Sequence, residues 1–327
     1  MEIVNNINCN GKLVNRAEFD QGRLDEFWNF VAERQRIWER RFILKSAPPW
    51  TSDKILATQH FTNVYRELDP GTKYAIKNIL GKDASAGDRF FNLLIYRLIG
   101  KEETHHFIGF QYLERFNSLE FENKLKTIRL QNKHPFTSAY MVSGYKSMGT
   151  SDKIVNISRI FSVVHSNFSE FFTTLKNASS FENAYKIVCS LNGFGNFLAY
   201  QVLVDATYPI EREKGISLLN ICPETWAAAG PGAKKGIRIL MGKFKVPDLS
   251  VMLWLRNNQK QEFERLGIDF PFIKDKLETP IEISLPNIQN CLCEFYKYVK
   301  ITEGWGRSRR SFNPRGIEEP ITNIQGE

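Results

Sequence analysis

A glycine- and lysine-rich segment in the last third of the chain has the residue types that bind anions. It reads Trp226-Ala-Ala-Ala-Gly-Pro-Gly-Ala-Lys-Lys-Gly236 and leads into the apolar run GIRILMG. A helix that begins here presents free backbone N–H groups and the positive end of its dipole, and the two lysines add charge. The segment is not a Walker A loop, because no Ser or Thr follows the lysines. It predicts an anion site, with a plain helix cap as the alternative, formed by Gly230, Gly232, Lys234, Lys235 and Gly236.

A second glycine pair stands between two amphipathic segments, in Leu191-Asn-Gly-Phe-Gly-Asn-Phe-Leu-Ala199. Two glycines separated by one apolar residue between short helices are typical of a helix-hairpin-helix. Glycines let the backbone approach a phosphate closely, and the following helix offers its N–H groups. The pattern predicts a DNA contact through Gly193, Gly195 and Asn196, with an ordinary helix corner as the alternative.

Two acids are candidates for proton transfer. Asp205 stands in the apolar run VLVDAT, ten residues after Gly195. Burying an acid without a partner is costly, so Asp205 is either paired with an arginine or catalytic. Glu294 belongs to a polar stripe in LPNIQNCLCEFYKY that either faces solvent or lines a cleft. The stripe comprises Asn287, Asn290, Cys291, Glu294 and Tyr298.

The first third of the chain offers cations beside aromatic residues. Arg34, Trp38 and Arg41 are spaced by four and three residues, which predicts two guanidinium groups and an indole on one helical face. Such a surface suits bases and phosphates, although a solvated basic face has the same pattern. The segment from Phe61 to Asp69 has an amide able to read a base edge and an Arg/Asp pair at i, i+3. The predicted DNA contacts, each with a structural alternative, are Arg34, Arg41, Trp50, Asn63, Arg66 and Arg238.

Composition narrows the class of protein. The 327 residues include 44 Lys and Arg against 36 Asp and Glu, a net charge of +8 that favours a polyanionic partner or simply maintains solubility. The five cysteines and five histidines lack the spacing of a disulfide framework or a metal site. No signal peptide or long apolar run is visible, which predicts a cytoplasmic protein without a membrane segment.

Helical periodicity runs through most of the chain, and alternating strand patterns are scarce. Apolar residues recur at helical spacing over 157–175, 285–299 and 24–31. The sequence therefore predicts an all-α protein. We expect an N-terminal extension over 1–20, a helical domain over 21–312 and a flexible tail over 313–327. A soft boundary divides the domain into sub-lobes 21–149 and 150–312.

Five motifs in a fixed order carry a resemblance to a known family. They read PWTSDKIL, FTNVYRELD, LNGFGNFLAYQ, AGPGAKKG and LCEFYKY. The chain resembles the α-glutamyl/putrescinyl thymine pyrophosphorylase family, which includes phage amino acid:DNA transferases, and the group described as the helical domain of 5-hydroxymethyluracil DNA kinases. The resemblance covers roughly residues 20 to 312. It implies a fold related to helix-hairpin-helix DNA glycosylases and action on thymine-derived bases in double-stranded DNA.

The resemblance also implies a reaction. A 5-(pyrophosphoryloxymethyl)uracil in DNA loses pyrophosphate to an amine from an amino acid or polyamine, in the host cytoplasm if the gene belongs to a phage. The expected roles are pyrophosphate binding by the Gly230 to Gly236 segment and proton transfer by Asp205 or Glu294. No redox or nucleotide cofactor is implied, and the hairpin leaves room for a metal ion. The alternatives are a DNA glycosylase or lyase acting on a modified thymine, and a non-catalytic DNA-binding module that partners a 5-hydroxymethyluracil DNA kinase.

Overall fold

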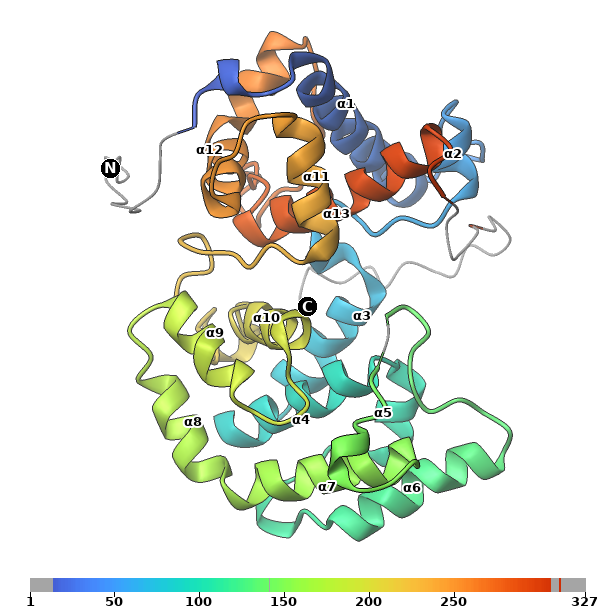
Figure 1. The fold of residues 1–327 in the computed structure, drawn as a ribbon, viewed down its shortest axis with the longest axis vertical. Helices are drawn as coiled ribbons and strands as arrows, with labels where there is room; N and C mark the ends of the chain where they lie inside the picture. Colours follow the sequence, from blue (N-terminus) through green and yellow to red (C-terminus); the bar gives the residue numbers. More distant parts are fainter. Residues whose placement is uncertain (1–13, 141, 307–311, 313–327) are drawn as a thin grey trace. The chain divides into compact units, whose positions relative to one another are not determined.

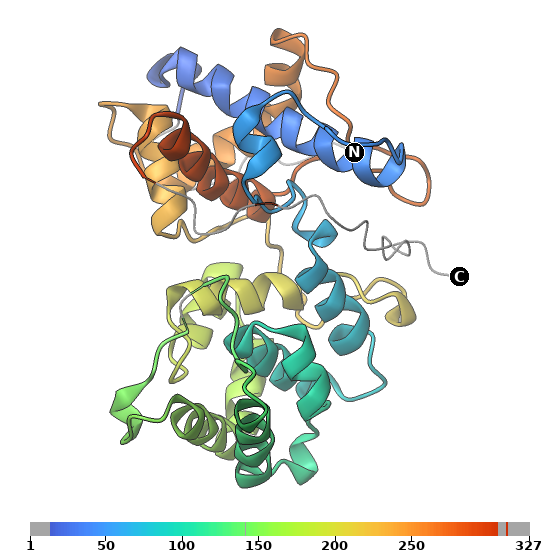
Figure 2. The same cartoon turned by 90° about the vertical axis from the view of Figure 1, so that its right-hand side faces the viewer.

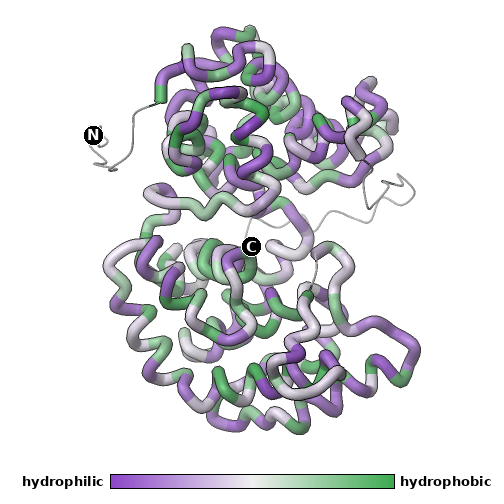
Figure 3. The backbone as a smooth tube through the Cα atoms, viewed as in Figure 1, coloured by the Kyte–Doolittle hydropathy of each residue, from purple (hydrophilic) through white to green (hydrophobic). Residues whose placement is uncertain are grey.

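The computed structural model describes residues 14–140, 142–306 and 312 (Figure 1). Within these residues the regular structure is helical, and isolated β-bridges join Ile210 to Ile216 and Lys274 to Pro280. The all-α prediction is confirmed. Polar and apolar residues alternate along the helices, as amphipathic helices around a core require (Figure 3). Over the same residues, no helix is both long enough and apolar enough to cross a membrane.

The described chain forms two compact units. Unit 1 combines the residues up to Asp69 with those from Glu224 onward, and unit 2 is Pro70–Pro223. The 149/150 boundary suggested by the sequence therefore falls inside unit 2. The division differs because the two ends of the chain share one core: Phe27 packs edge-on against Phe295, with ring centroids 5.4 Å apart. Local composition carries no signal of such a long-range contact.

The described residues of unit 1 contain five α-helices. They are α1 (Gln21–Trp38), α2 (Lys54–Thr58), α11 (Pro231–Met241), α12 (Asp248–Arg265) and α13 (Leu285–Thr302). A five-residue π-helix, Glu39–Ile43, continues α1, and a short 3₁₀ helix, Arg66–Leu68, precedes unit 2. Fully buried aromatic side chains, among them Trp28 of α1, fill the centre of the unit.

Helix α11 packs tightly against α13 because two glycines face it. A Cβ atom at Gly236 would lie 2.3 Å from the carbonyl oxygen of Leu292, and one at Gly232 would lie 2.3 Å from the Sγ of Cys293. At Gly236 the clash is with backbone, so a side chain there would require a shift of the helices, whereas at Gly232 it would require at least that the Cys293 side chain move. The spacing of these glycines therefore has a packing role that the sequence did not reveal.

Unit 2 surrounds one buried helix, α4 (Ala86–Ile99) (Figures 1 and 2). Its Phe91 meets Phe161 and Phe168 at ring distances of 5.9 and 5.5 Å. The other α-helices are α3 (Pro70–Ala75), α5 (Glu102–Ile108), α6 (Ser118–Leu130), α7 (Lys153–Ser166), α8 (Phe168–Lys176), α9 (Phe181–Cys189) and α10 (Asn196–Ala206). A π-helix over Ile76–Leu80 follows α3.

The single long helix expected over 157–175 is interrupted. Asn167 leaves the helical conformation, with φ −110° and ψ 9°, and separates α7 from α8. Its side-chain amide donates to the carbonyl of Val163. Asparagine competes with the helical backbone in this way, which explains a break that apolar periodicity alone does not show.

Helix starts follow from local sequence. In seven helices a side-chain oxygen at the N-cap accepts a hydrogen bond from the first turn, as short polar residues do. The capping residues are Asp20, Asp53, Ser85, Asn117, Asp152, Ser180 and Ser284.

Candidate functional site

The polar stripe of α13 packs against the segment from Phe61 to Asp69. The side-chain amide of Asn290 donates to Thr62 Oγ1 at 3.0 Å and to the carbonyl of Asn63 at 3.3 Å. Asn287 accepts from the backbone N–H of Arg66 at 3.0 Å. The stripe thus packs on the FTNVYRELD motif, and its Asn287 and Asn290 face protein instead of bulk solvent. Arg66 is 5 % exposed within this contact, which does not match a surface DNA contact.

Asp69 is the titratable group at the end of this segment. Its Oδ1 accepts from the backbone N–H of Asn63 at 2.9 Å and from the side-chain amide of Asn63 at 3.0 Å. Asn63 is thereby committed to Asp69 instead of a base edge. The pKa of Asp69 is raised to about 6, because burial and the nearby charge of Glu294 outweigh the Asn63 hydrogen bond and the charges of Arg66 and Arg34. A half-buried carboxyl that titrates near neutrality is suited to proton transfer.

Arg34 lies in the same cluster. Its Nη2 donates to the carbonyls of Phe61 at 3.1 Å and Thr62 at 2.7 Å, and the side chain is almost fully buried. Burial lowers the pKa of Arg34, and the charges of Glu294 and Asp69 oppose that effect. Arg34 therefore holds the segment from inside unit 1, contrary to the solvent-facing DNA contact expected from sequence.

Glu294 faces a lysine one turn further along α13. Its Oε2 lies 3.0 Å from Lys297 Nζ, and the Glu294 side chain is only 15 % exposed. Lys297 also donates to the carbonyl of His60 and lies 4.4 Å from the centre of the Phe61 ring. Glu294 and Asp69 thus belong to one charged cluster, which we call the 69/294 cluster: Arg34, Asp69, Glu294 and Lys297.

The predicted anion segment forms the start of α11. Gly230 is its N-cap and Pro231 its first residue, and Lys234, Lys235 and Arg238 are exposed. Lys235 lies 4.9 Å from the centre of the Tyr296 ring. The lysines and the helix start are therefore available to an anion, whereas Gly232 and Gly236 serve the contact with α13.

Asp205 has the buried arginine partner that the sequence left open. Its side chain is 0 % exposed, and both oxygens accept from Arg97, with Oδ1 2.7 Å from Nη2. Burial would lower the pKa of Arg97, but the charge of Asp205 and its hydrogen bond raise it on balance. This arrangement favours a structural role for Asp205 over the catalytic role expected first.

The glycine hairpin joins α9 to α10 in unit 2. Gly193 has φ +89°, and a Cβ there would lie 3.0 Å from Ile160 Cδ1, so the turn itself requires this glycine. Gly195 is the N-cap of α10 and has open space around its missing Cβ. Gly195 and Asn196 are exposed at the helix start. They are thus placed where a phosphate could approach.

The remaining predicted contacts lie elsewhere in unit 1. Trp50 is 6 % exposed, and its indole N–H donates to the carbonyl of Ser46 at 2.8 Å. Arg41 lies 5.1 Å from the centre of the Trp50 ring. The π-helix after Trp38 changes the residue spacing, so Arg41 does not continue the α-helical face of Arg34. Trp50 serves packing instead of an open base-binding surface.

Sequence reasoning did not single out Asp69 as an acid. The sequence feature that could have indicated a role for Asp69 is its position at the end of FTNVYRELD, one of the five motifs that carry the family resemblance. Its environment depends on residues of α1 and α13, more than 30 and 200 positions away. No group of three or more His, Cys, Asp or Glu within the described residues is placed to hold a metal ion.

Comparison with known proteins gives two matches. A family model described as "5-hmdU DNA kinase, helical domain" matches residues 21–306. A Bacillus phage SP10 protein named "5-hmdU DNA kinase" is 29% identical over 303 residues, which cover 88% of this chain and 47% of that protein. The chain therefore spans about half the length of this curated relative. No solved structure matches.

Proposed function

The chain belongs to the family of 5-hmdU DNA kinase helical domains, and from this membership we propose that it modifies 5-hydroxymethyluracil in phage DNA. The reaction we assign is amino acid:DNA transfer. The amine of an amino acid or polyamine attacks the methylene carbon of 5-(pyrophosphoryloxymethyl)uracil, and a C–N bond forms. The C–O bond breaks, and pyrophosphate leaves with the electron pair. The amine nitrogen gives its proton to a base.

The observation that carries this proposal is the 69/294 cluster. It places a carboxyl with a pKa of about 6 within the electrostatic reach of a buried arginine, and its two acids, Asp69 and Glu294, come from two motifs of the family resemblance. A base of this kind can accept the proton that the attacking amine loses. Asp69 is the first candidate and Glu294 the second, and both replace Asp205 in this role.

The leaving group needs positive charge. Negative charge grows on pyrophosphate as the C–O bond breaks, so preorganised cations and N–H groups stabilise the transition state. The start of α11 offers both, with Lys234 and Lys235 exposed in its first turns. We assign pyrophosphate binding to this helix start.

DNA binding is assigned to the hairpin of unit 2. The exposed Gly195 and Asn196 begin α10, whose free N–H groups can contact a phosphate. Two helices joined by a glycine turn are the arrangement of helix-hairpin-helix proteins, and this supports the relation to helix-hairpin-helix DNA glycosylases. A target base leaves the stack in enzymes of this type.

The direct test uses DNA that carries 5-(pyrophosphoryloxymethyl)uracil. The protein is incubated with this DNA and a mixture of amino acids and polyamines, and the nucleosides are analysed by mass spectrometry. An aminated thymidine together with released pyrophosphate supports the transfer. Abasic sites instead of aminated product indicate a glycosylase.

A second candidate is a non-catalytic module that partners a kinase. The observation in its favour is that the matched relative is about twice as long as the matched region and is named a kinase. If the chain is such a module, we expect it to leave the pyrophosphorylated DNA unchanged. We expect it instead to increase the phosphorylation of 5-hydroxymethyluracil DNA by a separate kinase.

Replacing Lys234 and Lys235 together by Ala is expected to reduce transfer by about 10²–10³-fold, since each preorganised donor to a developing anion contributes on that scale. DNA affinity should fall only modestly. Single-turnover rates and duplex affinity are measured on the same preparation. Lys243→Ala with Lys245→Ala is the matched control, because these exposed lysines follow α11 in the same unit. Normal turnover in the first double variant would remove the helix start from the mechanism.

Gly195→Val is expected to weaken binding to plain and modified duplexes alike by about ten-fold or more, the cost of losing one hydrogen bond to a charged phosphate. The open space around Gly195 accepts the side chain without internal clash, so the loss reports on the ligand. Gly193→Val is unsuitable, because its positive φ and its closeness to Ile160 disturb the fold itself. Fluorescence anisotropy measures affinity, and unchanged affinity would make the hairpin a structural corner.

A further inference from the structure

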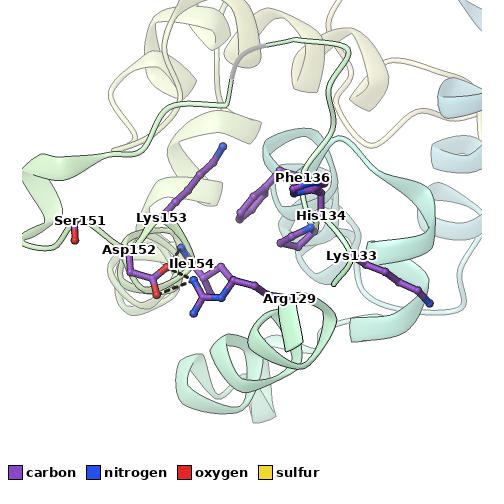
Figure 4. A pocket seen from close by; sticks show the side chains of 9 residues that line it. Arg129, Lys133, His134, Phe136, Ser151, Asp152, Lys153 and Ile154 are labelled. Atoms are coloured by element: carbon purple, nitrogen blue, oxygen red, sulfur yellow. Dashed lines mark hydrogen bonds and ion pairs between the residues drawn. The ribbon is translucent and has the colours of Figure 1, made fainter. Parts of the chain in front are cut away.

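Unit 2 contains a cavity of about 420 Å³ between the end of α6 and the start of α7 (Figure 4). Ligand sites of small molecules begin at about 300 Å³, so the cavity exceeds what a lone phosphate fills. In Figure 4 the side chains of His134 and Phe136 point toward the Arg129–Asp152 pair, and Lys133 extends away at the rim. The cavity therefore combines cationic groups with an aromatic wall.

The chain around the cavity is strongly basic. Between Asn123 and Ser169 it contains seven Lys or Arg residues and one acid, Asp152, and two of the lysines, Lys124 and Lys126, pair with Glu120 and Glu122. That acid is neutralised, because both of its oxygens accept from Arg129 at 2.9 and 3.0 Å and Oδ1 also caps α7. In the part of the chain that the structure describes, no ion pair is formed by Lys133, Lys146, Lys153 or Arg159.

Lys153 is the cation at the centre of this arrangement. Its Nζ donates to the carbonyl of Val142 at 2.7 Å and lies 4.5 Å from the centre of the Phe136 ring. An ammonium has three donors, so two remain for a ligand. The contacts position the charge at the cavity wall without neutralising it.

The same basic stretch reaches the hairpin. The hydroxyl of Tyr145 donates to the carbonyl of Gly193 at 2.9 Å. The side chain of Asn156, on α7, donates to the carbonyl of Gly144 at 2.8 Å. A continuous path of unit 2 residues thus links the cavity to the turn assigned to DNA binding.

We propose that this cavity is a second DNA-binding site that holds one nucleotide unit of the strand contacting the hairpin. The phosphate lies at Lys153, the exposed Lys133 adds positive charge at the rim, and the sugar packs on Phe136, while Arg129 stays paired with Asp152. This inference rests on the proposed function, because the substrate DNA supplies the phosphate. Phosphate contacts of this kind fix the position of a strand and read no sequence.

The test compares two double variants that remove the same charge. Lys133→Gln with Lys153→Gln changes the cavity, and Lys82→Gln with Lys176→Gln changes exposed lysines elsewhere in unit 2. The cavity variant is expected to bind a plain duplex about ten-fold or more weakly, with a salt slope reduced by about two. The control variant should keep the slope of the wild type. Lys153→Arg, which retains the charge, should restore most of the affinity.

Three results would overturn the assignment. Equal affinity and slope in the two double variants would remove the cavity from DNA binding while leaving the proposed function intact. Loss of binding to millimolar pyrophosphate with unchanged DNA binding would make the site one for a free anion. Failure of the wild-type protein to bind any duplex would overturn both the cavity site and the proposed function. Melting curves verify that each variant is folded.

Discussion

Asp69→Asn is expected to lower the rate of amine transfer by about 10²–10⁴-fold, the usual contribution of a positioned general base. The amide keeps the oxygen that accepts from the backbone and side chain of Asn63 at 2.9 and 3.0 Å. It loses the negative charge and the ability to take a proton. Single-turnover kinetics on pyrophosphorylated DNA measures the effect, and duplex affinity should be nearly unchanged.

The raised pKa of Asp69 also predicts how this substitution changes the stability of the protein. The pKa of Asp69 is raised in the folded protein from 3.8 to about 6, so the folded state favours the protonated form. The resulting stabilisation is fully present below pH 3.8 and is lost as the pH rises through about 6. Asp69→Asn removes this pH dependence, and at neutral pH the variant should be at least as stable as the wild type.

The pH profile of transfer gives an independent readout. Because the base form of Asp69 is required, the rate should rise with pH through about 6 in the wild type. The profile of Asp69→Asn should lack this limb. Asp275→Asn, at an exposed turn of unit 1, is the matched control. Full activity of Asp69→Asn would transfer the role to Glu294, which Glu294→Gln then tests.

Much of the secondary structure follows from neighbouring residues. Apolar spacing, N-cap side chains and the glycines at residues 193 and 195 predict helices and a turn that the structure contains. Long-range pairing is what the sequence did not supply. Asn290 meets Asn63 across 227 positions, and Arg97 meets Asp205 across 108. Periodicity identifies a polar stripe or a buried acid, but it does not identify the partner.

The lack of long-range information also explains why the structure buries several residues that the sequence predicted as DNA or anion contacts. Arg34 and Trp50 have residue types that suit DNA, yet both are nearly buried and their donors bind backbone carbonyls of unit 1. Gly232 and Gly236 suit an anion nest, but their missing side chains allow α11 to approach α13. Residue type specifies what a group is able to bind, and only the packed structure shows which groups remain accessible.

Asp205→Asn is expected to lower the free energy of unfolding by about 3–5 kcal/mol, the scale observed when one partner of a buried ion pair is removed. The carboxylate is 0 % exposed and the side chain of Arg97 is 13 % exposed, so the variant leaves a buried guanidinium without its counter-charge. Chemical denaturation at constant pH measures the loss. Glu182→Gln, which removes one partner of an exposed pair with Lys186, should cost only about 0–1 kcal/mol.

The activity of the same preparation separates structure from catalysis. Transfer per folded molecule should remain within a few-fold of the wild type, because neither oxygen of Asp205 reaches solvent. Replacing both partners, in Arg97→Met with Asp205→Leu, should recover part of the lost stability, since two apolar groups avoid the unpaired buried charge. A large loss of transfer with unchanged stability would contradict this assignment. Asp205 would then return to the mechanism as the base, in place of Asp69.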